Sequence, residues 1–409
     1  MTAFLELIQM AVFSVAAVFA SPFFWLVVYL VYVQYRRNHE MEIMVLGEAR
    51  KTLGEKVRNA IITGILGGLA GTIIIMLLGI TIEIKDFSYI FPLALLLMLI
   101  NMRYICFSYA GGLLALSSLI LGIPKLNVSS IMAIVAILHL VECILIYFDG
   151  YRDAVPVFLN DSRFGIVGGF MLQRFWPIPF AVLLAVAGPL EGAKEINLPD
   201  WWPIFKENID INSISLQISA VVAALGYGDT AVVNTPKMKS RKSAVRLFTY
   251  SIVLLALAVL STGITAFKYI AALFSPIGHE LLILYGQREE KSGIPQFRQR
   301  SHGVTVLDIM NGSIGEKIKL KQGDVILSVN NHDVNDREDI QQILHQFPTY
   351  IWIEIQDIKG KKRTIEYQDY RNGIGSLGIV LVPRESDIVF DTKNSVSLLK
   401  KLLQKLLRR

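Results

Sequence analysis

Few side chains that could do chemistry lie inside the long apolar segments of this sequence, and the clearest pair is His139 with Glu142. The two are three positions apart, so on a helix they would share one face. Ionisable groups inside a membrane segment are costly, and they commonly bind ligands, move protons or join helices. Asp229, which ends the run GYGD, is a further ionisable residue in an apolar segment and a candidate for the same reason. The sequence leaves open whether these residues have a functional role or only fix helix packing.

A second histidine, His279, is followed by Glu280, as at the start of the zinc-protease motif His-Glu-x-x-His. That motif needs two histidines at i and i+4, so that both face one metal, and a glutamate as base. The position four after His279 is Ile283, so the second ligand is missing. A metal on His139 and Glu142 would need His279 and Glu280 to approach from another segment. We predict no metal, no cofactor and no catalytic residue.

Other catalytic patterns are missing from the sequence as well. It contains no Gly-x-Ser-x-Gly, no phosphate-binding loop and no internal repeat of the kind that transporters show. Both cysteines, Cys106 and Cys143, fall inside apolar runs, which indicates small buried hydrophobic residues in reduced form. We therefore expect a protein that is not an enzyme.

The elements that must position these residues are membrane helices. Of the 409 residues, 53% are hydrophobic, and they cluster in windows that hold at most one charge. The net charge of +6 is typical of a membrane protein with a basic cytoplasmic side next to anionic lipid. The sequence has no basic stretch with interleaved aromatic residues, so it gives no sign of nucleic-acid binding. The predicted spans are Ile8–Val33, Ala60–Ile82, Phe87–Asn101, Tyr104–Leu121, Ser129–Phe148, Phe175–Pro189, Gln217–Val233 and two within Leu247–Tyr285, divided near Lys268. This gives nine spans, with eight or seven as alternatives because some segments are short or contain proline.

Charge asymmetry predicts the orientation of these spans. Segments 34–59 and 234–246 are basic and should be cytoplasmic, whereas segment 191–210 is acidic and should be outside, with Trp201 and Trp202 as an interfacial anchor. Nine crossings place the N-terminus outside and everything after Tyr285 in the cytoplasm. If the first segment re-enters instead of crossing, only the N-terminus changes side.

Glycines of the second predicted span are spaced for close packing. Gly64 and Gly68, and likewise Gly67 and Gly71, are four positions apart, which lets helix backbones approach closely. We expect this face to pack inside the bundle and not to form a dimer.

The chain changes character after residue 287. We predict a membrane domain at 1–287, a polar linker at 288–300, a small α+β domain at 301–384 and a basic tail at 385–409. In the tail, Ser395–Arg409 has a leucine stripe opposite lysines and arginines, which is typical of a helix on an anionic membrane surface. In the α+β domain we predict strands at Val304–Ile309, Val325–Val329, Tyr350–Ile358, Arg363–Tyr367 and Gly378–Val382, and helices at Ile314–Leu320 and after the capping residue Asp336.

The run NGSIGEKIKLKQGDVILSVNNHDVNDREDIQQIL, Asn311–Leu344, resembles the core of a bacterial PDZ domain. The resemblance implies a cytoplasmic PDZ-like domain that adds an extended peptide to a sheet edge beside a helix. The loop Gly375–Ile379 resembles the carboxylate-binding turn of that family, placed late in the chain. The implied peptide-binding residues are Leu377, Gly378 and Ile379 in the loop and Ile340, Ile343 and Leu344 on the helix. Whether the ligand is a C-terminus or an internal segment stays open.

The whole layout, an α-helical polytopic membrane bundle followed by this domain, is similar to the MinJ-type cell-division topological determinants of Gram-positive rods. The stretches His139–Leu159 and Gly226–Ala244 carry the resemblance together with the PDZ core. It implies a membrane scaffold, enriched at septa and poles, that bridges a DivIVA-like polar scaffold and a MinD-like ATPase and so restrains FtsZ-dependent septation near poles. A homo-oligomer stays open. The alternatives are a degenerate PDZ-bearing relative of intramembrane proteases with a regulatory role and a transporter-like protein.

Overall fold

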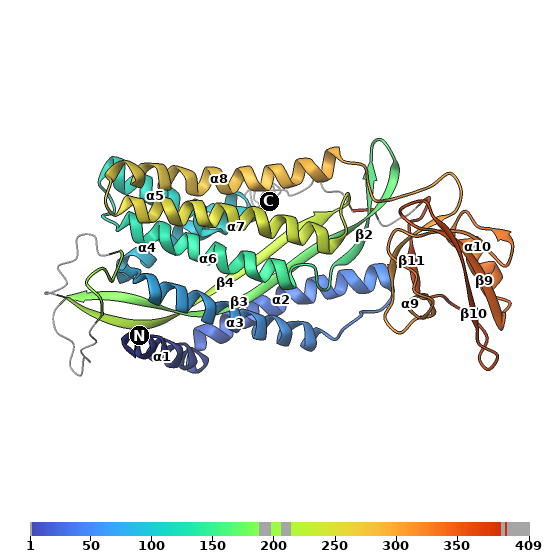
Figure 1. Cartoon of the computed structure of the whole chain (residues 1–409), viewed down its shortest axis with the longest axis horizontal. Helices are drawn as coiled ribbons and strands as arrows, with labels where there is room; N and C mark the ends of the chain where they lie inside the picture. The colour runs from blue at the N-terminus through green and yellow to red at the C-terminus, as the bar shows by residue number, and fades with distance from the viewer. Residues whose placement is uncertain (1, 188–197, 206–213, 386–388, 391–409) are drawn as a thin grey trace, which may run out of the picture.

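The computed structural model describes residues 2–187, 198–205, 214–385 and 389–390. It shows an elongated helical body with a small β-rich domain at one end (Figure 1). The helices of the body are α1 (Thr2–Ala17), α2 (Pro22–Leu46), α3 (Leu53–Leu78), α4 (Ile84–Ile100), α5 (Phe107–Leu121), α6 (Val128–Asp149), α7 (Pro236–Ser261) and α8 (Thr265–Ser292). Within the described ranges, five helical stretches are long and apolar enough to cross a membrane: Ala3–Ala20, α3, α6, α7 and α8.

Two of the predicted helical spans are strands. The segments predicted as Phe175–Pro189 and Gln217–Val233 belong to β3 (Gly165–Ala187) and β4 (Ile214–Ala231), which form one long antiparallel hairpin. The prediction was wrong because an apolar run without alternation has the same appearance in a buried strand and in a buried helix. The hairpin runs the length of the helical body and returns, so it still accounts for two passes along the body (Figure 1).

Three short strands extend the sheet around this hairpin. β2 (Val155–Asp161) pairs antiparallel with the beginning of β3, and β5 (Phe297–Arg298) pairs at Val167 and Gly168. β1 (Thr81–Ile82) pairs parallel with β3 near its other end. β1 and β2 lie on the edge of β3 opposite β4, so the middle of that edge has no strand partner among the described residues.

Helix α3 covers that middle part of β3. Pro177 and Pro179 have no N–H to donate there, and the N–H of Ala181 donates to Thr72 Oγ1 at 2.9 Å. Because lipid cannot satisfy backbone groups, a strand edge in an apolar body needs such partners. The prolines, which are unfavourable in a helix interior, suit this edge.

The glycines of α3 explain how closely the helix approaches. A Cβ added to Gly64 would lie 2.1 Å from the carbonyl oxygen of Pro177, and one added to Gly68 would lie 1.9 Å from that of Pro179. The glycine face thus packs inside the body, as expected, but against a strand and not only against helices.

The first predicted segment, Ile8–Val33, is divided at Ser21, before Pro22 begins α2, as its Ser21-Pro22 sequence indicates. The last segment, predicted to divide near Lys268, turns at Thr262 and Gly263 instead, and Lys268 lies in the first turn of α8. The turn forms at the glycine, and the single charge does not end the helix.

Both basic segments, 34–59 and 234–246, lie at the end of the body that carries the β-rich domain, and we call this the basic end (Figure 1). Buried ion pairs collect there. Arg174 of β3 is fully buried and pairs with Asp149 at 2.5 Å and with Asp153 at 2.8 Å, while Lys56 pairs with Glu42. Breaking one partner of such a pair would leave an uncompensated charge. The Arg174 pairs therefore fix the hairpin to the end of α6, and the Lys56 pair fixes α3 to α2.

Parts of two further predictions fall outside the described residues. The tail helix Ser395–Arg409 lies there entirely, and so does most of the acidic segment 191–210. Of the aromatic pair, Trp202 is buried and donates from Nε1 to the carbonyl of Met76 at 2.9 Å, and Trp201 is 55% exposed. Trp202 therefore packs against the end of α3 instead of facing an interface.

The β-rich domain closely follows the predicted elements. It contains β6 (Val304–Ile309), α9 (Ile314–Lys317), β7 (Val325–Val329), β8 (His332–Asp333), α10 (Arg337–Leu344), β9 (Tyr350–Gln356), β10 (Lys362–Gln368) and β11 (Ile379–Leu381). The sheet order is β10-β9-β7-β6-β11. Asp336 caps α10 in a capping box with Asp339.

The segment 288–300 is more structured than a polar linker would be. Helix α8 continues to Ser292, and β5 joins the sheet of the body. Leu307 and Val382 of the β-rich domain pack around Gly168 of β3, and Asp308 forms an ion pair with Arg50 at 3.0 Å. The domain is thereby docked on the basic end.

Candidate functional site

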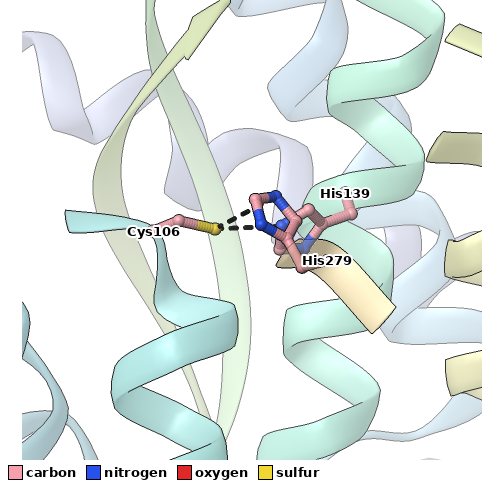
Figure 2. Close-up of side chains that lie close together, drawn as sticks. All are labelled: Cys106, His139 and His279. Atoms are coloured by element: carbon pink, nitrogen blue, oxygen red, sulfur yellow. Dashed lines mark hydrogen bonds between the residues drawn. The ribbon is translucent and has the colours of Figure 1, made fainter. Parts of the chain in front are cut away.

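Three side chains with metal-binding donor atoms meet in the middle of the helical body (Figure 2). Cys106 precedes α5, His139 is at the midpoint of α6, and His279 is at the midpoint of α8. The Sγ atom of Cys106 lies 3.1 Å from Nε2 of His139 and 3.8 Å from Nε2 of His279. A ligand cluster at His139 would need His279 to approach from another segment, and the structure shows that it does. Cys106, expected to be only a small buried hydrophobic residue, is the third member.

Hydrogen bonds orient both imidazole rings. Nδ1 of His139 lies 2.6 Å from the carbonyl oxygen of Val135, which can only accept, so Nδ1 carries the proton. Nδ1 of His279 lies 3.3 Å from the hydroxyl of Tyr109, which itself donates to Glu280 at 2.7 Å. Each ring thus presents Nε2 to the sulfur.

Glu280 is not placed to act as the base of a protease motif. Its carboxylate accepts the hydrogen bond from Tyr109 and forms an ion pair with Arg103 at 2.9 Å. Glu280 thus holds the Tyr109 hydroxyl, which in turn orients the ring of His279. Glu142, half-buried one turn after His139, interacts electrostatically with His139, His279 and Cys106.

Asp229 lies on strand β4 and not at the end of a helix. Its carboxylate pairs with the fully buried Lys239 of α7 at 3.2 Å and accepts from Ser243 at 3.1 Å. Lys239 also approaches Glu290 of α8 at 3.6 Å. Asp229 therefore ties the hairpin to α7, and Lys239 extends the contact to α8.

The predicted peptide groove would be bordered by β11 and α10. β11 is the last strand of its sheet in the described part of the chain and pairs on one side, with β6. Of the predicted contact residues, Ile340, Leu344 and Leu377 are buried in the core of the domain, whereas Ile343 and Ile379 are half-buried. Ile343 and Ile379 are therefore the predicted contact residues whose side chains are exposed enough to touch a ligand.

The loop before β11 is held in one backbone conformation, and the N–H of Gly378 donates to Ser376 Oγ at 3.1 Å. Gly378 has φ of +62°, and a Cβ there would lie 2.4 Å from the Cβ of Ser313, so only glycine fits. The carbonyls of Leu377 and Gly378 accept from Gly315 at 2.8 Å and Met310 at 2.9 Å. The loop is therefore fixed to α9 and β6 before any ligand binds.

Phe347, which the sequence did not single out, borders the same groove. It follows α10, has φ of +47° and is 62% exposed. Its ring lies beside Gly375, where an added Cβ would be 2.8 Å from Cε1. The sequence signal for Phe347 was the position of an aromatic residue shortly after the helix predicted to line the groove.

Comparison with known proteins agrees with this architecture. The model of a PDZ domain family matches residues 305–357. The chain is 25% identical over 258 residues to the cell division topological determinant MinJ of Bacillus subtilis (strain 168), which covers 62% of each chain. It is also 25% identical over 84 residues to probable cell division topological determinants MinJ of Lacticaseibacillus paracasei and Lacticaseibacillus casei (strain BD-II), covering 20% of this chain and 23% of theirs.

These matches span less than two thirds of the length of the relatives. Only 122 residues follow position 287, so the longest match also includes more than 100 residues of the helical body. The chain is thus a membrane protein with a PDZ domain, and its helical body takes part in a distant similarity to MinJ.

Proposed function

We propose that this protein is a membrane-anchored adaptor for division-site placement. The observation that carries the proposal is the MinJ similarity, because it includes more than 100 residues of the helical body and stands beside a separate PDZ-family match. A PDZ domain alone occurs in proteins of many functions, whereas the combination of both parts restricts the choice. The adaptor would bridge a DivIVA-like polar scaffold and a MinD-like ATPase, and so restrain FtsZ-dependent septation near poles.

The PDZ domain would capture an extended segment of a partner protein. An added strand can pair with the free edge of β11, and main-chain hydrogen bonds would supply affinity. Ile343, Ile379 and Phe347 would select side chains of that segment, and the loop at Gly378 would receive a carboxylate if the ligand is a C-terminus.

Docking at the basic end supports a cytoplasmic position for the PDZ domain. Basic segments favour the cytoplasmic side, and Arg50 of such a segment pairs with Asp308 of the domain. The domain would then face cytosolic division proteins while the basic tail, 385–409, lies on the lipid surface.

The test combines localisation with proximity labelling. A functional fluorescent fusion should concentrate at septa and poles, and deletion of the gene should give minicells or filaments. Labelling from the C-terminus should recover a polar scaffold and a MinD-like ATPase. Uniform membrane fluorescence with normal division would overturn the proposal.

A matched pair of variants separates groove binding from mere presence of the domain. Ile343→Lys places a charge in the groove, whereas Gln342→Lys places the same charge at the exposed neighbouring position of α10. We expect the first variant to lose PDZ-dependent partners and the second to keep them. Equal labelling by both variants would show that partners do not bind in this groove.

A further inference from the structure

We propose that Cys106, His139 and His279 together bind one divalent transition metal of the zinc class inside the helical body. Thiolate and imidazole are the ligands that zinc prefers in proteins. The three donor atoms lie within 4.8 Å of one another and come from three separate segments of the chain. This inference is independent of the division-site proposal.

The distances fit a shared tetrahedral metal. With Zn–S near 2.3 Å and Zn–N near 2.05 Å, sulfur and nitrogen ligands of one tetrahedral zinc lie about 3.6 Å apart. The two distances from Cys106 Sγ are 3.1 Å to His139 and 3.8 Å to His279, on either side of that value. Small shifts of side chains would therefore suffice to bind the ion.

Proton positions favour a metal over a hydrogen-bonded cluster. Both Nδ1 atoms donate, to Val135 and to Tyr109, so in the neutral rings both Nε2 atoms carry lone pairs toward the sulfur. A thiol has one proton and can donate to only one of them. A cation satisfies both nitrogens and the thiolate at once. The Nδ1 partners are the supporting bonds that metal-bound histidines commonly make.

Charge balance points to Glu142 as the counter-charge. A divalent ion with one thiolate keeps a charge of +1, which is costly in an apolar body. Glu142 faces the same side of α6 as His139 and interacts electrostatically with the whole cluster. With its carboxylate the site is neutral. A metal held by these three ligands would join α6, α8 and the start of α5.

A competing interpretation is a nucleophilic pair, in which His139 activates the Cys106 thiolate. A Cys106–His139 pair does not explain why Nε2 of His279 also faces the sulfur of Cys106. We favour the metal for this reason, and the experiment below distinguishes the two.

The test is metal analysis of the full chain purified in detergent without chelator. We expect about one zinc per chain in the wild type and almost none in Cys106→Ser, His139→Ala or His279→Ala. Matched controls are Cys143→Ser, which changes the other cysteine, and His345→Ala in the PDZ domain. Both should keep the metal. A wild type without stoichiometric metal after zinc reconstitution, or equal loss in the controls, would overturn the proposal.

Two further measurements guard against variants that misfold. Tyr109→Phe removes the partner of His279 but no ligand, and should weaken zinc binding by roughly 10- to 100-fold. Cobalt substitution should give a thiolate charge-transfer band that Cys143→Ser keeps and Cys106→Ser loses. If instead Cys106 is alkylated rapidly in the zinc-treated wild type, and that protein holds no stoichiometric zinc, the nucleophilic pair is the correct assignment.

Discussion

Gly68 of α3 lies directly against the carbonyl oxygen of Pro179 in β3, so close that a Cβ on the glycine would be 1.9 Å from that oxygen. Backbone meets backbone here without a side chain between them. The contact is how a long strand is held inside a body of helices, and it makes the helix–strand distance sensitive to a single methyl group.

Gly68→Ala should destabilise the helical body. The added methyl group forces α3 away from β3, and overpacking of this kind costs roughly 1–3 kcal/mol. We expect a lower melting temperature in detergent, measured by fluorescence-detected size exclusion. Gly54→Ala in the first turn of the same helix has open space around its Cβ and should be neutral or slightly stabilising. Similar losses in both variants would contradict the close contact.

Thr72→Val tests the hydrogen bond that satisfies β3. Valine has the same shape but leaves the buried N–H of Ala181 without its acceptor, which costs about 1–3 kcal/mol. Thr63→Val is the control, because the Thr63 hydroxyl donates only to carbonyls of its own helix. Thermal unfolding should separate the two variants. An unchanged Thr72→Val protein would mean that the edge of β3 is satisfied in another way.

The docking of the PDZ domain should depend on pH through Asp308. Burial raises the pKa of this carboxyl above its usual 3.8, although Arg50 acts in the opposite direction. A raised pKa means that the docked state holds the proton more tightly, so docking should strengthen as the pH falls from neutral through that pKa. Distances between spin labels on the two parts would report it. Asp308→Asn should remove the dependence on pH, and weaker docking in acid would contradict it.

Removal of metal should lower the stability of the helical body where α6, α8 and the start of α5 meet. If zinc joins α6, α8 and the start of α5, a chelator should lower the melting temperature of the wild type and of His345→Ala. It should not change that of His139→Ala, which has no site to empty. Melting curves with and without chelator measure this, and an equal response of all three proteins would exclude the site as the cause.

The PDZ domain could be predicted from the sequence almost element by element. Its strand Tyr350–Gln356 alternates between faces, and Asp336 marks the start of α10 by side-chain capping. Local signals of this kind were sufficient because each element has one buried and one exposed face.

The hairpin and the cluster could not be predicted in the same way. β3 is apolar on both faces, so nothing in its sequence except Pro177 and Pro179 contradicts a helix. Cys106 is 33 residues from His139 and 173 from His279, and no short spacing connects them. Only the packing of three helical segments brings these donors together.

The β3–β4 hairpin has a consequence for how the chain is made. A membrane helix completes its hydrogen bonds alone and can leave the insertion machinery into lipid as soon as it emerges. β3 cannot do this, since its partner β4 is synthesised later and its other edge needs α3. The backbone of β3 therefore completes its hydrogen bonds only after β4, which ends at Ala231, has been synthesised.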